Sequence, residues 1–76
     1  MSEQIVSPGA AEFDRLPDSA FIGVRAVAQV FGISVPSAWR WSRDGALPKP
    51  VRLSAGSTRW RVGDLRKRLA ELSEAA

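Results

Sequence analysis

Tryptophan and arginine alternate in the stretch SAWRWSRDG, which spans residues 37–45. An arginine side chain can bind a phosphate group, or the O6 and N7 acceptors of guanine, through two parallel hydrogen bonds. A neighbouring aromatic ring can pack along a sugar–phosphate chain or on base edges. A hydrophobic core alone does not require two large aromatic residues on either side of a basic one. The spacing therefore points to binding of a polymer that carries phosphate groups.

The composition excludes several other kinds of chemistry. The 76 residues include no cysteine, histidine or tyrosine. This removes disulfide bonds, zinc ligation by cysteine or histidine, and the commonest proton-transfer group. The serines have no histidine base, and no pair of carboxylates is predicted to share a pocket. We therefore expect no enzyme activity, no catalytic residue, no metal site and no cofactor.

The sequence also argues against secretion and against a membrane partner. No apolar run approaches the roughly 20 residues that span a bilayer. The N-terminal stretch MSEQIVSPGAAEF has neither the basic n-region nor the apolar h-region of a signal peptide. Binding to an anionic membrane surface would need a basic amphipathic helix with a bulky apolar face. We expect an intracellular, soluble domain.

The formal net charge of +3 is distributed unevenly along the chain. Residues 1–20 carry four carboxylates against one arginine, whereas residues 21–68 carry ten lysines and arginines against Asp44 and Asp64, a net of +8. Such a concentration is typical of a phosphate-binding domain, with a merely solvated basic surface as the alternative. We expect a flexible acidic arm over residues 1–20 and one folded domain over residues 21–76.

Apolar residues at helical spacing predict two short helices joined by a tight turn. In FIGVRAVAQVFGIS the apolar residues recur with the period of a helix over about residues 24–31, and Gly32 is a suitable stop. Ser34 is a good N-cap, and Pro36 suits the first turn of a second helix over about residues 35–44, which Gly45 ends. Two such helices separated by GIS form a candidate helix-turn-helix.

The rest of the chain predicts a hairpin and a third helix. Pro48 and Pro50 exclude a helix after Gly45, and the flanks VRL and TRWR of the segment SAGS alternate between apolar and polar residues. This predicts a β-hairpin with Arg52, Arg59 and Arg61 on a positive face, and with Val51, Leu53, Trp60 and Val62 on a dry face. Leucines at positions 65, 69 and 72, with Asp64 near the N-cap, predict an amphipathic helix. The expected fold is mostly α with a small β-hairpin wing, a winged helix-turn-helix.

The two tryptophans of the second predicted helix lie about 160° apart around its axis. Trp41 shares a side with Ala38, which we expect to face the core. Trp39 lies nearer to Arg40 and Arg43, and we expect it to be exposed at least in part. Its ring would either pack against the hairpin or the acidic arm, or lie along the sugar–phosphate wall or the base edges of DNA. Arg40 is the best candidate for a guanine contact. The alternative for Arg40 is an intrahelical ion pair with Asp44.

The order VRAVAQVFGISVPSAWRWSRDGALPKPVRLSAGSTRWRVGDLRKRL resembles the AlpA-like and excisionase-like proteins of phages and integrated elements. These are small winged helix-turn-helix domains related to the DNA-binding head of MerR-type regulators. The resemblance covers about residues 24–69, and G-x-L-P-K-P followed after a short hairpin by R-W-R is its most specific part. It implies sequence-specific binding to double-stranded DNA, with the second helix in the major groove and the wing beside it. It also implies a cytoplasmic bacterial protein that is associated with the nucleoid.

The candidate DNA-binding residues follow from the resemblance and from the predicted hairpin. In the recognition helix they are Val35, Pro36, Ser37, Trp39, Arg40 and Arg43. By resemblance the wing residues are Ser54, Gly56, Ser57, Thr58 and Arg59, and the polar face of the hairpin adds Arg52 and Arg61.

Two roles are compatible with such a domain. An excisionase bends DNA and assists an integrase, whereas a transcriptional regulator blocks or recruits RNA polymerase. In either role, cooperative self-association on neighbouring sites would strengthen binding by a domain this small. The alternatives are the DNA-recognition domain of a phage packaging protein, and a protein-interaction module that docks through the leucines of the third helix.

Overall fold

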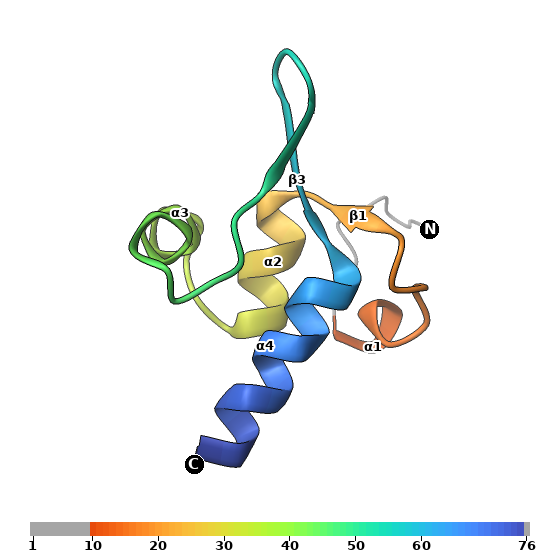
Figure 1. Ribbon diagram of the computed structural model, residues 1–76, viewed down its shortest axis with the longest axis vertical. Coiled ribbons are helices and arrows are strands. Elements are labelled where there is room, and N and C mark those ends of the chain that lie inside the picture. The colour runs from red at the N-terminus through yellow and green to blue at the C-terminus, as the bar shows by residue number, and fades with distance from the viewer. Residues whose placement is uncertain (1–9, 76) are drawn as a thin grey trace, which may run out of the picture.

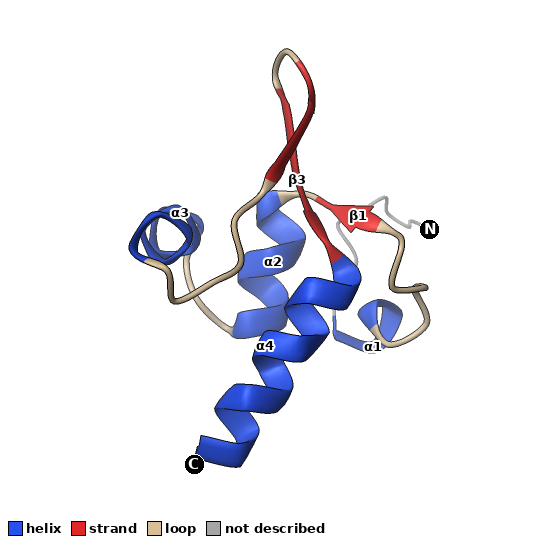
Figure 2. Ribbon diagram, viewed as in Figure 1, coloured by secondary structure: helices blue, strands red, loops and turns tan. Residues whose placement is uncertain are grey.

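The computed structural model describes residues 10–75, in which four helices pack around a small antiparallel sheet (Figures 1 and 2). The sheet has the strand order β1-β3-β2. Within these residues, no helix has both the length and the apolar character needed to cross a membrane. The architecture is mostly α with a projecting hairpin, which confirms the predicted winged helix-turn-helix. The elements are α1 (Ala10–Phe13), β1 (Phe21–Ile22), α2 (Val24–Phe31), α3 (Val35–Asp44), β2 (Val51–Ser54), β3 (Ser57–Arg61) and α4 (Val62–Ala75).

The helix-turn-helix pair α2 and α3 has the predicted bounds because its ends are encoded locally. Gly32 ends α2 in the left-handed conformation, with a φ of 68°, and its N–H donates to the last carbonyls of the helix. Ser34 caps α3, since its Oγ accepts a hydrogen bond from the backbone N–H of Ser37 at 3.2 Å. Pro36 lies in the first turn, and Gly45 ends α3 with a φ of 93°.

The core lies where α2, α3, β3 and α4 meet. The largest fully buried side chains are Trp60, Leu65, Val27 and Val62. The predicted burial of Trp60 is therefore confirmed. Trp41 is partly buried and packs against this core, on the side of α3 that also carries the buried Ala38. Helix α4 begins at Val62 rather than near Asp64, so Val62 enters the core from a helix and not from the hairpin.

The hairpin forms where it was predicted, but its two faces are not those predicted. Val51 pairs with Arg59 and Arg52 pairs with Thr58, whereas Ser54 pairs with Ser57, so Leu53 is an extra residue in β2. Paired residues of an antiparallel sheet lie on the same face. Arg52 therefore shares a face with Thr58, and Val51 lies beside Arg59.

The predicted dry face of the hairpin is wrong in its β2 half. Val51 and Leu53 are 41% and 52% exposed, because the hairpin extends past the helices and nothing covers β2 there (Figure 1). A one-residue shift of register exchanges the two faces of a strand, and a bulge at Leu53 supplies that shift. All four residues of β2 are exposed, so the predicted alternation is absent there, whereas in β3 Trp60 is buried between the less buried Arg59 and Arg61.

Residues 10–20 pack against the helices, which corrects the expectation of a free arm for this segment. Phe13 is buried in the core. The carbonyls of Asp18 and Ala20 accept hydrogen bonds from the backbone N–H groups of Gly63 and Val62, at 3.0 and 2.8 Å. These bonds satisfy N–H groups at the start of α4 that have no partner within the helix. Residues 1–9 of the expected arm lie outside the described residues.

Arg66 holds this N-terminal segment against α4. Its Nη2 donates to the backbone carbonyls of Phe13, Asp14 and Leu16, and its Nη1 forms an ion pair with Asp18 Oδ1 at 2.6 Å. The guanidinium also lies 5.3 Å from the centroid of the Phe13 ring. Arg66 is one of the ten basic residues whose concentration over residues 21–68 predicted a phosphate-binding domain. In the structure it joins two segments that are far apart in the sequence.

Candidate nucleic-acid interface

The exposed side of α3 presents short polar and basic side chains along one line. Arg40 and Arg43 are exposed, and Ser37 is half-buried one turn before Arg40. Arg40 Nη2 donates to Ser37 Oγ at 3.3 Å. Asp44 pairs instead with the adjacent Arg43, whose Nε lies 3.3 Å from Asp44 Oδ1. The intrahelical pair that was the alternative for Arg40 is thus absent from the described ion pairs, and Arg40 extends toward the start of the helix.

The opposite side of α3 is fixed to β3 by a buried tryptophan. Trp60 Nε1 donates to Ser42 Oγ at 3.2 Å and to the carbonyl of Pro48 at 3.0 Å. Ser42 Oγ in turn donates to the Ala38 carbonyl at 2.9 Å. Ser42 is the one buried polar residue found in the described part of the chain. These bonds join α3, the segment after it and the wing strand, and so fix the direction in which Arg40 and Arg43 point.

Trp39 is both exposed and packed. It is 44% exposed, and its ring centroid lies 5.2 Å from that of Trp60 with a tilt of 54° between the rings. The buried ring of Trp60 supports one side of Trp39 and leaves the other side to solvent. The expected partial exposure of Trp39 is confirmed, and its ring packs against a residue of β3 in the hairpin.

A hollow of about 330 Å³ lies between α3 and the wing. It brings together candidate residues from both elements, which the sequence assigned to separate groups. Arg59 also donates from Nη1 to the Thr58 carbonyl at 2.9 Å, which holds its guanidinium near the strand. The lining residues are Val24, Trp39, Arg52, Gly56, Thr58 and Arg59.

Several other candidate residues lie outside this hollow. Arg61 Nη1 forms an ion pair with Asp64 Oδ1 at 3.3 Å, at the start of α4. Ser54 and Ser57 pair with each other beside the turn of the wing. Val35 is half-buried and packs against the core rather than standing clear of it. Pro36 is exposed in the first turn of α3.

A second hollow, of about 420 Å³, borders the other flank of Trp39 and includes a residue that was not among the candidates. Lys49 lies in the segment between α3 and β2 and lines this hollow with Trp39, Ser42, Arg43 and Pro50. The signal that could have found Lys49 is its place between two prolines, five residues after the end of α3.

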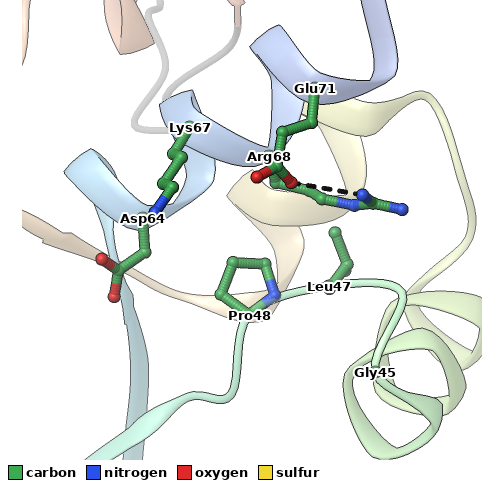
Figure 3. A pocket seen from close by; sticks show the side chains of 7 residues that line it. All are labelled: Gly45, Leu47, Pro48, Asp64, Lys67, Arg68 and Glu71. Carbon is green, nitrogen blue, oxygen red and sulfur yellow. Dashed lines mark hydrogen bonds and ion pairs between the residues drawn. The ribbon is translucent and has the colours of Figure 1, made fainter. Parts of the chain in front are cut away.

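A third hollow lies on the far side of the same segment, against α4 (Figure 3). Arg68 lines it and donates from Nε to the Ala46 carbonyl at 2.7 Å, while its Nη1 pairs with Glu71 Oε1 at 3.3 Å. The carboxylates of Asp64 and Glu71 balance the charges of Lys67 and Arg68 in this lining, so the hollow has no net positive charge to attract a phosphate. Arg68, like Arg66, holds the fold together. Within residues 10–75, no three histidine, cysteine or acidic side chains gather as a metal site would require.

The protein is a winged helix-turn-helix protein. The helix pair α2 and α3 packs against the core, the hairpin of β2 and β3 projects beside it, and the exposed face of α3 is basic. Comparison with family models shows the particular group. The chain belongs to the family described as prophage CP4-57 regulatory protein (AlpA), whose model matches residues 17–71. The AlpA-like resemblance of the sequence is thereby confirmed. Neither the curated proteins nor the solved structures contain a match to the chain.

Proposed function

We propose that this protein is a regulator of a phage or mobile element that binds specific sites on double-stranded DNA. Helix α3 enters the major groove, and the hairpin of β2 and β3 lies in the neighbouring groove. The observation that carries this proposal is the hollow that joins α3 to the wing, where Trp39 lies with Arg52 and Arg59. Membership of a family of phage regulatory proteins supports it.

The distribution of basic residues favours this reading over a uniformly solvated surface. Arg66 and Arg68 are engaged with backbone carbonyls, and Arg61 is paired with Asp64. Of the eight other lysines and arginines among the described residues, five lie on α3, on the segment after it and on the wing: Arg40, Arg43, Lys49, Arg52 and Arg59. The other three, Arg15, Arg25 and Lys67, are exposed elsewhere on the fold.

The recognition-helix residues have distinct expected roles. The major groove, about 12 Å wide, admits a helix, and an arginine in its middle can bind guanine O6 and N7. Arg40 is the residue we assign to that contact. Ser37 is one turn closer to the start of α3 and is assigned to a base edge or a phosphate oxygen. Arg43 and Trp39 are assigned to the sugar–phosphate backbone.

The wing residues are assigned to phosphates and to the minor groove. Arginine is favoured in a narrow minor groove by its negative potential. Arg52 and Arg59 border the hollow next to α3, and the turn at Gly56 is small enough to approach the DNA backbone closely. Short hydrogen-bonding side chains come from Ser54, Ser57 and Thr58. Arg61, which pairs with Asp64, lies outside the hollow next to α3.

Selection of binders from a random duplex library at about 150 mM salt tests the proposal, because non-specific phosphate binding is already weak there. We expect one enriched motif. Binding that enriches no motif and persists only at low salt would contradict sequence-specific recognition. The protein-interaction alternative would then gain weight, since Leu72 of α4 is exposed.

The arrangement of enriched sites distinguishes the two roles. A single site that overlaps a promoter supports a transcriptional regulator that acts on RNA polymerase. Closely spaced direct sites beside an attachment site support an excisionase that assists an integrase. Either role places the protein with the bacterial nucleoid.

A further inference from the structure

The second hollow, which Lys49 lines with Trp39, is bordered by both apolar and basic side chains. The ring of Trp39 and the pyrrolidine ring of Pro50 are apolar, and Arg43 and Lys49 add two cations. The fifth lining residue, Ser42, already donates to Ala38 and accepts from Trp60. Its hydroxyl is therefore committed to the fold. A ligand in this hollow would therefore meet an apolar surface and two positive charges.

The hollow is formed before any ligand binds. Trp39 rests on the buried ring of Trp60. The segment that carries Lys49 is held on its other side, where the Pro48 carbonyl accepts from Trp60 Nε1 at 3.0 Å. Proline on both sides of Lys49 restricts φ at two of three consecutive residues. A preformed site loses little conformational entropy on binding.

Both cations are available to an anion. The side chain of Arg43 is 73% exposed, and its bond to Asp44 uses one of five guanidinium N–H donors. Lys49 is exposed and forms no ion pair with another described residue. Arg43 and Lys49 come from different elements, so a single anion held by both would fix α3 relative to the segment that follows it.

We infer that this hollow binds one sugar–phosphate unit of the DNA backbone, with the phosphate between Arg43 and Lys49 and the deoxyribose against Trp39 and Pro50. The inference rests on the proposed function and adds Lys49 and Pro50 to the DNA contacts. A backbone unit is favoured over a free small anion because Trp39 borders both this hollow and the one shared with the wing. The unit therefore continues the proposed DNA surface. Binding of this sugar–phosphate unit fixes the depth and register of α3 in the major groove.

The salt dependence of operator binding provides the first test, with Lys67→Ala as the matched control for Lys49→Ala. Both lysines are exposed and carry the same charge, but Lys67 lies on α4 and lines the hollow that contains Asp64 and Glu71. Each phosphate contact contributes about 0.9 to the slope of log K against log salt. We expect the slope of Lys49→Ala to be shallower than wild type by about one contact. The wild type would then lose about threefold more affinity than the variant between 50 and 200 mM salt. Lys67→Ala should retain the wild-type slope.

A scan of single uncharged methylphosphonate linkages along the selected operator locates the contact. At one linkage we expect Lys49→Ala to lose less affinity than the wild type, because in the variant only Arg43 remains to bind that phosphate. Lys49→Arg should restore the loss at that linkage. Equal slopes for Lys49→Ala and Lys67→Ala, or additive losses at every linkage, would overturn the inference while leaving DNA recognition intact. Failure of the wild type to select any operator would instead overturn the proposed function.

Discussion

Substitutions of Arg40 can distinguish a contact with a base from a contact with a phosphate. It extends along the exposed face of α3, where Ser37 Oγ accepts one of its hydrogen bonds at 3.3 Å. A guanidinium can bind O6 and N7 of guanine together, whereas a lysine ammonium offers a point charge without that fixed geometry. Arg40→Ala therefore removes both the charge and the paired hydrogen bonds, whereas Arg40→Lys keeps the charge and removes only the geometry of those bonds.

We expect Arg40→Ala to weaken operator binding by roughly 1–3 kcal/mol and to relax the preference at one base position. Arg40→Lys should keep part of the non-specific affinity but should not restore that preference. Binding isotherms on the operator and on single-base variants of it measure both effects. If Arg40→Lys bound every variant as the wild type does, Arg40 would be a phosphate contact.

Trp60 and Ser42 form the buried polar connection that orients α3. Trp60→Phe removes both bonds of Nε1 and part of the buried ring, so we expect unfolding to become easier by about 2–4 kcal/mol. Ser42→Ala should cost only about 1 kcal/mol, because Trp60 Nε1 keeps its bond to the Pro48 carbonyl. Urea denaturation measures both, with Ser73→Ala on the exposed side of α4 as control. Equal costs for Trp60→Phe and Ser42→Ala would contradict this ranking.

At the scale of elements, the end of α3 depends on one backbone conformation. Gly45 has a φ of 93°, and a Cβ placed there would meet no atom within 4 Å. The cost of Gly45→Ala is therefore a backbone cost, which we expect to be about 1–2 kcal/mol of unfolding free energy. Gly45→Asn should cost less, because asparagine tolerates the left-handed region. Thermal or urea denaturation compares them, and equal losses would point to a lost contact instead.

The attachment of residues 10–20 to α4 depends on Arg66. Arg66→Met keeps much of the aliphatic stem but removes the donors that serve three backbone carbonyls. We expect a loss of about 1–3 kcal/mol and faster amide exchange at Arg15 and Leu16, whose N–H groups bond within this segment. Lys67→Met, one residue along the same helix, is the control. Unchanged exchange in Arg66→Met would mean that Phe13 and the backbone bonds of Asp18 and Ala20 hold the segment without Arg66.

At the scale of the whole molecule, a domain of 76 residues presents only a small surface to DNA. Single modules of this kind bury about 600–1,000 Å² and bind modestly. We expect a single site to be bound more weakly than about 10 nM at physiological salt, and two adjacent sites to be filled cooperatively. Gel-shift titrations on one and two sites test this. Saturation of one isolated site at nanomolar concentration would show that no second copy or partner is required.

Local sequence signals were sufficient to predict the helix-turn-helix. The bounds of α2 and α3 depend on apolar spacing, on a serine cap and on two glycines, all of which act within a few residues. The burial of Trp60 and the presence of a hairpin followed from alternation in the same way. The motif that carried the family resemblance was also local, since GALPKP directly precedes β2 and STRWR is strand β3 itself.

Pairings between distant residues could not be predicted in this way. The bulge at Leu53 placed Arg52 with Thr58 and left Val51 and Leu53 exposed, because strand register depends on contacts across the hairpin rather than on either strand alone. Strand β1 is two residues long and exists only through its pairing with β3. Neither feature has a periodic signal of its own.

The sequence by itself therefore determined the kind of protein: a small basic domain whose helix-turn-helix and wing are encoded by caps, periodicity and turn residues. The tertiary structure alone decided which charges remain available to DNA. Arg66 and Arg68 turn inward because backbone carbonyls of Phe13, Leu16 and Ala46 lie within reach, whereas Lys49 lies beside Trp39 and Arg43 because the proline-containing segment folds back along α3. The orientation of a charged side chain depends on the partners that the packing of distant segments places near it.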